Sequence, residues 1–311
     1  MQLLANVGSV ADAQRARAIG AEGIGLLRTE FLFSQNTSVP DEQHQADLYT
    51  EVIMASGPTP GPIVVRTLDA GGDKPLSALA PLLSHHLAEA NPALGVRGIR
   101  LQAGITDLLA IQLRAIVRAA RRTQADVRVM LPMVSTVDEI RAAHQVLTQA
   151  LATFTDADIV PDRPIPLGVM VETPAAVLTL ELLAQEAAFF SIGTNDLTQY
   201  VMAADRLNPQ LAALCDPAQP AVLRAIAAVV RTAQFTRRHV SVCGEMAGDP
   251  VLAQLLVGLG IETLSIGPSG IPTVQDALAT RTYAELQAMA ERVLHLANVR
   301  EVRQCLAELA I

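Results

Sequence analysis

Residues 167–176 read LGVMVETPAA, and a second segment, residues 189–200, reads FFSIGTNDLTQY. Each begins with a short apolar run of strand length and continues through a polar turn into a helical pattern. Thr173 stands immediately before Pro174. This pair is typical of a helix N-terminus, because threonine can cap the helix and proline is tolerated in its first turn. The two segments therefore predict two successive units of a strand followed by a helix.

The same alternation runs through the whole chain. Ser9 with Asp12, and Asp249 before Pro250, also have the pattern of a helix start. Eight short apolar runs precede such helical stretches and are predicted to be strands: 3–7, 23–27, 63–66, 127–131, 167–171, 189–192, 240–243 and 263–266.

Eight parallel strands, each followed by a helix, predict a (β/α)8 TIM barrel of the α/β class. Such a barrel needs about 250 residues in its minimal form. The chain of 311 residues is therefore expected to be one domain, residues 1–311, with insertions after the second and third strands at about 34–62 and 69–105.

Composition excludes several classes of protein. Half of the residues are hydrophobic, and the formal net charge is -8, which argues against a nucleic-acid-binding surface. Three cysteines without metal-ligand spacing predict neither disulfides nor structural zinc. We expect no membrane insertion and a cytoplasmic protein, because no apolar run reaches about 20 residues and no secretory leader is evident. Lys74 is the only lysine, although 23 residues are Lys or Arg, so chemistry that arginine cannot supply is one explanation for it and compositional bias is the other.

Reactive residue types follow the predicted strands. In TIM barrels the chemistry lies on the loops at the carboxyl ends of the strands. One such charge could be a solvent contact, but several on one rim predict a site. The rim residues of this kind are Arg28, Arg66, Met133, Glu172, Thr194, Asn195, Asp196, Cys243 and Glu245.

Two arginines and two carboxylates on this rim indicate an anionic ligand with a cation. Arg28 and Arg66 lie on adjacent strands and offer planar donor groups to a phosphate or carboxylate, unless they form surface ion pairs. Glu172 and Asp196 end the fifth and sixth strands and would bind one divalent cation, with Mg²⁺ favoured, unless they cap helices. Both interpretations stay open at this point.

Cys243 lies in VCGEMAGDP, residues 242–250, where a predicted strand runs into a glycine-rich turn. A lone cysteine is most often a buried structural thiol. Its rim position and the neighbouring glycine, which permits close approach of a ligand, favour a reactive thiol.

Seven segments together resemble the phosphoenolpyruvate-binding barrel of the phosphoenolpyruvate-utilising enzymes. The resemblance is greatest to enzyme I of the sugar phosphotransferase system, including the enzyme I part of multiphosphoryl transfer proteins. RTLDAGGDK distinguishes it from the dikinase and synthase relatives. In chain order the segments are GIGLLRTEFLF (23–33), RTLDAGGDKPL (66–76), NPALGVRGIR (91–100), LPMVSTVDE (131–139), GVMVETPAA (168–176), FFSIGTNDLTQY (189–200) and VCGEMAGDP (242–250).

The resemblance implies a role for each matching residue. Glu172 and Asp196 match the Mg²⁺ ligands, and Cys243 matches the acid that protonates the enolate carbon to give pyruvate. Residues that match the surroundings of the phosphoryl and carboxylate groups of phosphoenolpyruvate are Arg28, Arg66, Lys74, Arg97, Asn195 and Arg206.

The resemblance also implies partners that this chain does not itself match. In enzyme I the phosphoryl acceptor is a histidine on a separate N-terminal domain, which passes the group to the phosphocarrier protein, and the barrel forms a homodimer. Nothing here resembles the phosphohistidine domain, so we expect an isolated phosphoenolpyruvate-binding domain. Residues 84–86, SHH, lack the surroundings of a phosphohistidine loop and are predicted to be exposed. Val96 and the GPSGIP segment, residues 267–272, also depart from the enzyme I pattern and would affect the edge of the pocket or the dimer surface.

Two other functions fit the same barrel. One is a Mg²⁺-dependent lyase or aldolase acting on pyruvate-like substrates, and the other is a non-catalytic dimerisation or regulatory module. Arg28, Arg66, Lys74 and Arg206 favour a phosphorylated ligand over the lyase substrates, since a phosphoryl group requires more cationic donors than a carboxylate. The non-catalytic module merges with the phosphotransferase hypothesis, because without an acceptor domain the chain would bind its ligand without turnover.

Overall fold

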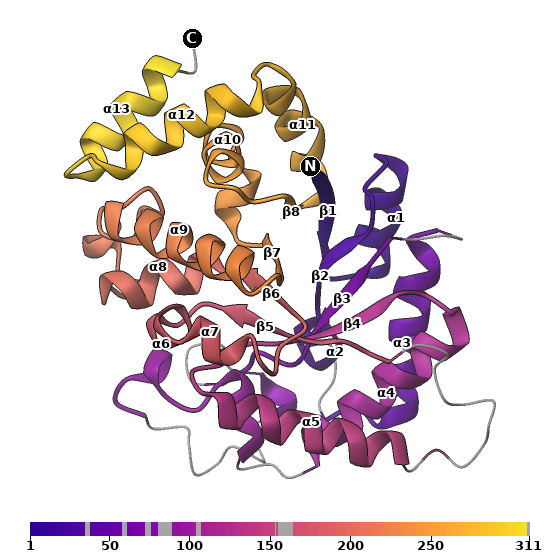
Figure 1. Cartoon of the computed structure of the whole chain (residues 1–311). Helices are drawn as coiled ribbons and strands as arrows, with labels where there is room; N and C mark the ends of the chain where they lie inside the picture. The colour runs from indigo at the N-terminus through magenta and orange to yellow at the C-terminus, as the bar shows by residue number, and fades with distance from the viewer. Residues whose placement is uncertain are drawn as a thin grey trace.

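The computed structural model describes residues 1–34, 38–57, 61–71, 76–79, 89–103, 107–152, 154 and 164–309. Its eight parallel strands close into a barrel in sequence order, with β1 paired to both β2 and β8, which confirms the predicted fold (Figure 1). The strands are β1 (Gln2–Val7), β2 (Ile24–Arg28), β3 (Ile63–Arg66), β4 (Val127–Leu131), β5 (Leu167–Val171), β6 (Phe189–Ile192), β7 (His239–Val242) and β8 (Thr263–Ile266).

Helices surround the barrel and connect its strands. In Figure 1, α3, α4 and α5 cover one flank, and α10, α12 and α13 are stacked at the opposite one. The helices are α1 (Val10–Ala18), α2 (Glu30–Ser34), α3 (Glu42–Ala55), α4 (Leu108–Thr123), α5 (Val137–Ala152), α6 (Pro174–Leu178), α7 (Leu180–Leu183), α8 (Thr194–Met202), α9 (Pro220–Phe235), α10 (Pro250–Gly258), α11 (Ile271–Ala279), α12 (Tyr283–Leu294) and α13 (Val299–Leu309). None of these helices is long and apolar enough to cross a membrane.

The predicted helix starts are confirmed. Ser9 accepts a hydrogen bond from the backbone N–H of Asp12, and Thr173 accepts one from Ala176. Asp249 accepts from the backbone N–H groups of the second and third residues of α10. Each cap satisfies N–H groups that have no partner within the helix, and so determines where the chain turns back from the barrel rim.

The segment between β2 and β3 differs from the predicted insertion. Its helix α3 packs against both α1 and α4, so it is the outer helix of the second unit and belongs to the regular barrel. The short helix α2 at the end of β2 is the extra element. After β3, the described part of residues 69–105 contains three 3-10 turns: η1 (Ser77–Leu79), η2 (Pro92–Leu94) and η3 (Gly98–Ala103).

Strand ends at the rim also differ by one residue from the prediction. β2 extends to Arg28 because Arg28 pairs with Arg66 of β3. β7 ends at Val242, so Cys243 is the first residue beyond the strand. These shifts leave the predicted residues at the carboxyl end of the barrel.

The alternation of side chains along each strand aims the rim residues inward. A small apolar cluster inside the barrel includes Leu26, Val64 and Met170 and is separate from the main core between strands and helices. Two residues further along the same strands come, respectively, Arg28, Arg66 and Glu172. Because side chains two apart in a strand lie on the same face, these three charged groups continue the inner face into the barrel mouth.

Candidate active site

The carboxyl ends of the strands surround a cavity of about 1040 Å³. A cavity of this size is in the range of small-molecule sites. It brings together seven of the predicted site residues, which are Arg28, Arg66, Glu172, Asn195, Asp196, Arg206 and Cys243.

One predicted ligand-binding residue among the described residues stands apart from this cavity wall. Arg97 does not line the cavity and its side chain is fully buried behind Asp196. Direct ligand contact by Arg97 therefore stays a prediction. Lys74 and residues 84–86 lie outside the described residues.

Arg66 is held between two acidic side chains. Its Nη2 donates to Oε1 of Glu30 at 2.9 Å, and its Nη1 lies 3.3 Å from Oδ2 of Asp69. Only 8% of the Arg66 side chain is exposed. Burial alone would lower the pKa of Arg66, but Glu30, Asp69 and Glu172 raise it above its ordinary value, so Arg66 is a permanent cation.

Arg97 connects two buried carboxylates. Its guanidinium donates to both oxygens of Asp69, at 3.1 Å and 2.9 Å, and to Oδ1 of Asp196 at 3.1 Å. Asp196 is also 3.3 Å from Nη1 of Arg206. Burial lowers the pKa of Arg97, while Asp69 and Asp196 raise it further than burial lowers it. The predicted metal ligand Asp196 is thus oriented by two arginines.

Glu172 is almost fully buried at the base of the cavity. Its Oε1 accepts the backbone N–H of Met133 at 2.6 Å. Met133 has a φ of 61°, in the left-handed region that costs energy for a residue with a Cβ, and this conformation is part of the turn that presents its N–H. A Cβ at Gly193 would lie 2.8 Å from Oε2 of Glu172, so any other residue there would displace this carboxylate.

The negative charge of Glu172 is costly at this buried position. Burial, with Asp196 and Asp69 as nearby negative charges, raises the pKa of Glu172 to about 8, although Arg66 and Arg97 oppose this. A divalent cation between Glu172 and Asp196 would replace the proton and relieve the repulsion. Two hard carboxylates on one cavity wall suit Mg²⁺, which takes its other ligands from substrate oxygens and water. The residues present therefore fit this cation.

Cys243 is buried with its thiol at the inner end of the cavity. Its Sγ donates to the carbonyl of Ile192 at 3.7 Å. Burial raises the pKa of the thiol to about 11, although the nearby hydroxyl of Ser191 and the positive charge of Arg66 oppose this. The thiol is consequently protonated at neutral pH and able to donate a proton.

Two amides tie neighbouring strand ends together around this thiol. Asn6 of β1 donates to the carbonyl oxygen of Cys243 at 3.0 Å and accepts from Ser265 of β8 at 2.6 Å. Asn195 accepts the backbone N–H of Glu245 at 3.0 Å, which joins the loops after β6 and β7.

Sequence reasoning missed Glu30, Asp69 and Asn6. Glu30 comes two residues after Arg28, and Asp69 comes three after Arg66. An acid so close behind a buried rim arginine was the available signal, because a buried cation requires a counter-charge. Asn6 carried no comparable signal beyond its place at the end of the first strand.

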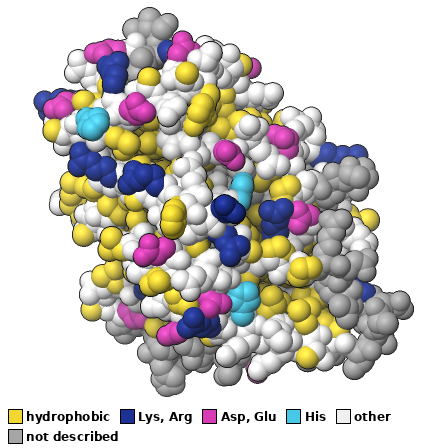
Figure 2. All heavy atoms as spheres, in the orientation of Figure 1, with side chains coloured by type: hydrophobic (Ala, Val, Ile, Leu, Met, Phe, Trp, Pro, Cys, Tyr) yellow, Lys and Arg dark blue, Asp and Glu magenta, His cyan; other side chains and the backbone are white. Residues whose placement is uncertain are grey.

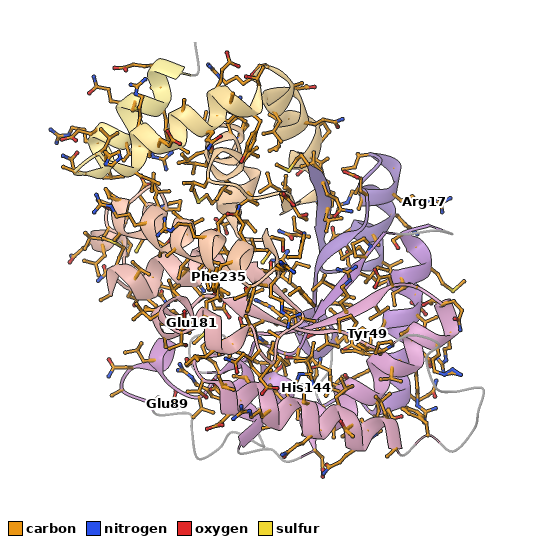
Figure 3. The ribbon with its side chains drawn as sticks, in the orientation of Figure 1. Arg17, Tyr49, Glu89, His144, Glu181 and Phe235 are labelled. Atoms are coloured by element: carbon orange, nitrogen blue, oxygen red, sulfur yellow. The ribbon has the colours of Figure 1, made fainter. Side chains whose placement is uncertain are left out.

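A buried polar chain supports the loop that carries Asp69. Tyr49 lies on α3, and its hydroxyl accepts from Gln112 of α4 at 3.0 Å (Figure 3). Oε1 of Gln112 in turn accepts the backbone N–H of Leu68 at 2.9 Å. The loop after β3 is therefore anchored to the helix ring as well as to the rim.

On the face shown in Figure 2, acidic and basic side chains are interspersed.

Comparison with known proteins identifies relatives along nearly the whole chain. Residues 1–283 match the family model described as PEP-utilising enzyme, PEP-binding domain. The phosphoenolpyruvate-protein phosphotransferase of Haloferax volcanii is 46% identical over 308 residues, covering 98% of this chain and 53% of that protein. The multiphosphoryl transfer protein of Xanthomonas campestris is 44% identical over 300 residues, covering 96% of this chain and 34% of that protein. The chain thus spans about half the length of the first relative and a third of the second.

A citrate lyase structure from Burkholderia xenovorans is similar in fold, with a TM-score of 0.54 and 18% identity. It covers 99% of this chain and 90% of that chain. At this identity the likeness supports the barrel fold alone.

Proposed function

Because the chain belongs to the family of phosphoenolpyruvate-utilising enzymes and matches their phosphoenolpyruvate-binding domain, we propose that it is the phosphoenolpyruvate-binding part of a phosphoenolpyruvate-protein phosphotransferase. In this role it binds phosphoenolpyruvate with Mg²⁺, donates the phosphoryl group to a histidine on a separate domain and releases pyruvate. The observation that carries the proposal is one cavity whose lining includes three arginines, the neighbouring carboxylates of Glu172 and Asp196, and the protonated thiol of Cys243.

Arg28, Arg66 and Arg206 bind the substrate. Phosphoenolpyruvate carries a phosphoryl group and a carboxylate, both of which suit the planar donor groups of arginine. Three guanidinium groups around one cavity provide more cationic hydrogen-bond donors than a carboxylate alone requires, and this favours the phosphorylated ligand over the substrate of a lyase. Asn195 adds an amide beside them.

Glu172 and Asp196 would hold the Mg²⁺ ion. When bound, the ion supplies positive charge that stabilises the transferring phosphoryl group. Arg97 holds the Asp196 carboxylate from the side away from the cavity, and the N–H of Met133 holds that of Glu172. The protein thereby orients both carboxylates before the ligands arrive.

Cys243 completes the reaction. Transfer breaks the bond between phosphorus and the enol oxygen, forms a bond between phosphorus and the histidine nitrogen, and leaves the enolate of pyruvate. The thiol of Cys243 then gives its proton to the terminal carbon, and the thiolate regains a proton from solvent. Protonation at carbon makes the transfer favourable because it removes the enolate.

The partners of this domain follow from the relatives' greater length. The names of those relatives support transfer of the phosphoryl group to a protein. We propose that the acceptor is a histidine on a separate domain and that a phosphocarrier protein receives the group next. We propose that the barrel works as a homodimer in the cytoplasm.

Titration calorimetry tests binding first. The chain is titrated with phosphoenolpyruvate with and without Mg²⁺, and with pyruvate as the control ligand. We expect Mg²⁺-dependent binding that favours phosphoenolpyruvate, and pyruvate release once a matching histidine domain is added. A folded chain that binds phosphoenolpyruvate no better than pyruvate would refute the proposal.

A further inference from the structure

Glu30 connects Arg66 to the loop after β3 through a single oxygen atom. It is the first residue of α2, directly after β2. Its Oε1 accepts Nη2 of Arg66 at 2.9 Å and the backbone N–H of Asp69 at 3.0 Å. Its buried Oε2 has no hydrogen-bond partner among the described residues.

Arg66 depends on such contacts for its orientation. An arginine side chain has many rotamers, and a site that orders it only on ligand binding loses affinity through the entropy of ordering. Besides Glu30, the guanidinium contacts Asp69 at 3.3 Å and the sulfur of Met170 at 3.7 Å. Asp69 is held through its backbone by Glu30 and through its carboxylate by Arg97, whereas Glu30 is the acid that accepts from Nη2 of Arg66.

We propose that Glu30 is a positioning residue that orients Arg66 toward the phosphoryl group of the ligand and thereby contributes to the preference for phosphoenolpyruvate over pyruvate. This inference rests on the proposed function. Glu30 does not line the cavity, so it acts through Arg66 and the Asp69 loop.

Charge and hydrogen bonding at Glu30 have opposite effects on an anionic ligand. The negative charge of Glu30 repels phosphoenolpyruvate, so its removal alone should strengthen binding. The two hydrogen bonds position Arg66, so their loss should weaken binding. Glu30→Gln removes the charge but keeps an oxygen that can accept both hydrogen bonds. Glu30→Ala removes the charge and the two hydrogen bonds together.

The experiment compares these two variants by calorimetry with phosphoenolpyruvate and pyruvate. Loss of hydrogen bonds to a buried cation should weaken phosphoenolpyruvate about tenfold to a hundredfold in Glu30→Ala. We expect pyruvate affinity to be unchanged in Glu30→Ala, and phosphoenolpyruvate affinity in Glu30→Gln to equal or exceed that of the wild type. Glu42→Gln is the matched control, since Glu42 accepts from Arg114 and Arg118 between α3 and α4 and does not line the cavity. It should leave both affinities unchanged.

A second measurement needs no ligand. Nitrogen NMR of the arginine side chains should show slow rotation of the Arg66 guanidinium in the wild type and Glu30→Gln, and fast rotation in Glu30→Ala. If the wild type failed to bind phosphoenolpyruvate, the proposed function would be lost, but this measurement would still show whether Glu30 holds Arg66. The inference is overturned if Glu30→Ala leaves Arg66 rotation slow, weakens both ligands equally, or binds phosphoenolpyruvate more tightly.

Discussion

Arg97→Met should destabilise the chain more than the substitution of an arginine on the surface. The variant keeps a long unbranched side chain but removes the cation between Asp69 and Asp196, whose carboxylates are buried. Breaking a buried ion pair by removing one partner costs about 3–5 kcal/mol. We expect about 3 kcal/mol, at the low end of that range, because Asp69 keeps its contact with Arg66 and Asp196 keeps Arg206.

The loss should be visible as a fall in melting temperature. With an unfolding entropy of about 2 cal/mol/K per residue, a loss of about 3 kcal/mol lowers the melting temperature of a chain of this length by about 5 °C. Circular dichroism and urea unfolding measure it. The matched control is Arg122→Met, because Arg122 pairs with Asp47 while 38% exposed, and such pairs contribute less than about 1 kcal/mol.

A second substitution separates lost charge pairing from lost packing. Asp69→Asn removes the charge of one of the two carboxylates that lose Arg97 in Arg97→Met, so the double variant should lose less stability than the two single losses added together. If Arg97→Met melted within a degree of Arg122→Met, or if the two losses simply added, the buried charge network would not be stabilising Asp196 as described.

Three further predictions concern the site. Cys243→Ala should leave phosphoenolpyruvate affinity within about threefold of wild type while abolishing pyruvate release with the histidine domain; an equal loss of both would mean that the thiol is structural. Arg66→Ala should weaken phosphoenolpyruvate by about tenfold or more, because a charge-assisted contact to the phosphoryl group is lost, and should weaken pyruvate much less, as calorimetry will show. The pKa of Glu172 is raised to about 8 in the folded chain. The stability that this group contributes is therefore fully present below its ordinary pKa and is lost as pH rises toward 8. Mg²⁺ should therefore raise the melting temperature more at pH 8.5 than at pH 6, and equal increases at both values would contradict a proton–metal exchange at Glu172.

Local patterns along the chain were sufficient to predict the barrel. The structure confirmed the predicted strands, the helix caps such as Ser9 and Thr173, and the alternation of strands with helices. Each of these signals depends on neighbours within a few residues. The segment between β2 and β3 was harder, because whether α3 belongs to the ring depends on its packing against α1 and α4.

Most residues of the site could also be predicted, because the period of two along a strand and the closure of the barrel carry Arg28, Arg66 and Glu172 to one mouth. Their partners could not. Whether Arg97 faces the cavity or is buried behind Asp196 depends on a contact between residues 99 positions apart. The same holds for the contact between Glu30, which follows β2, and Arg66, which ends β3.

The sequence by itself thus determined the fold, the rim and the residue types that meet there, since each follows from local periodicity and from the common direction of parallel strands. Only the tertiary structure decided which charges pair, that Met133 turns its N–H toward Glu172, and how far burial moves the pKa values of Glu172 and Cys243. The physical reason is that pairing, strain and desolvation depend on distances of a few ångströms between segments far apart in the chain.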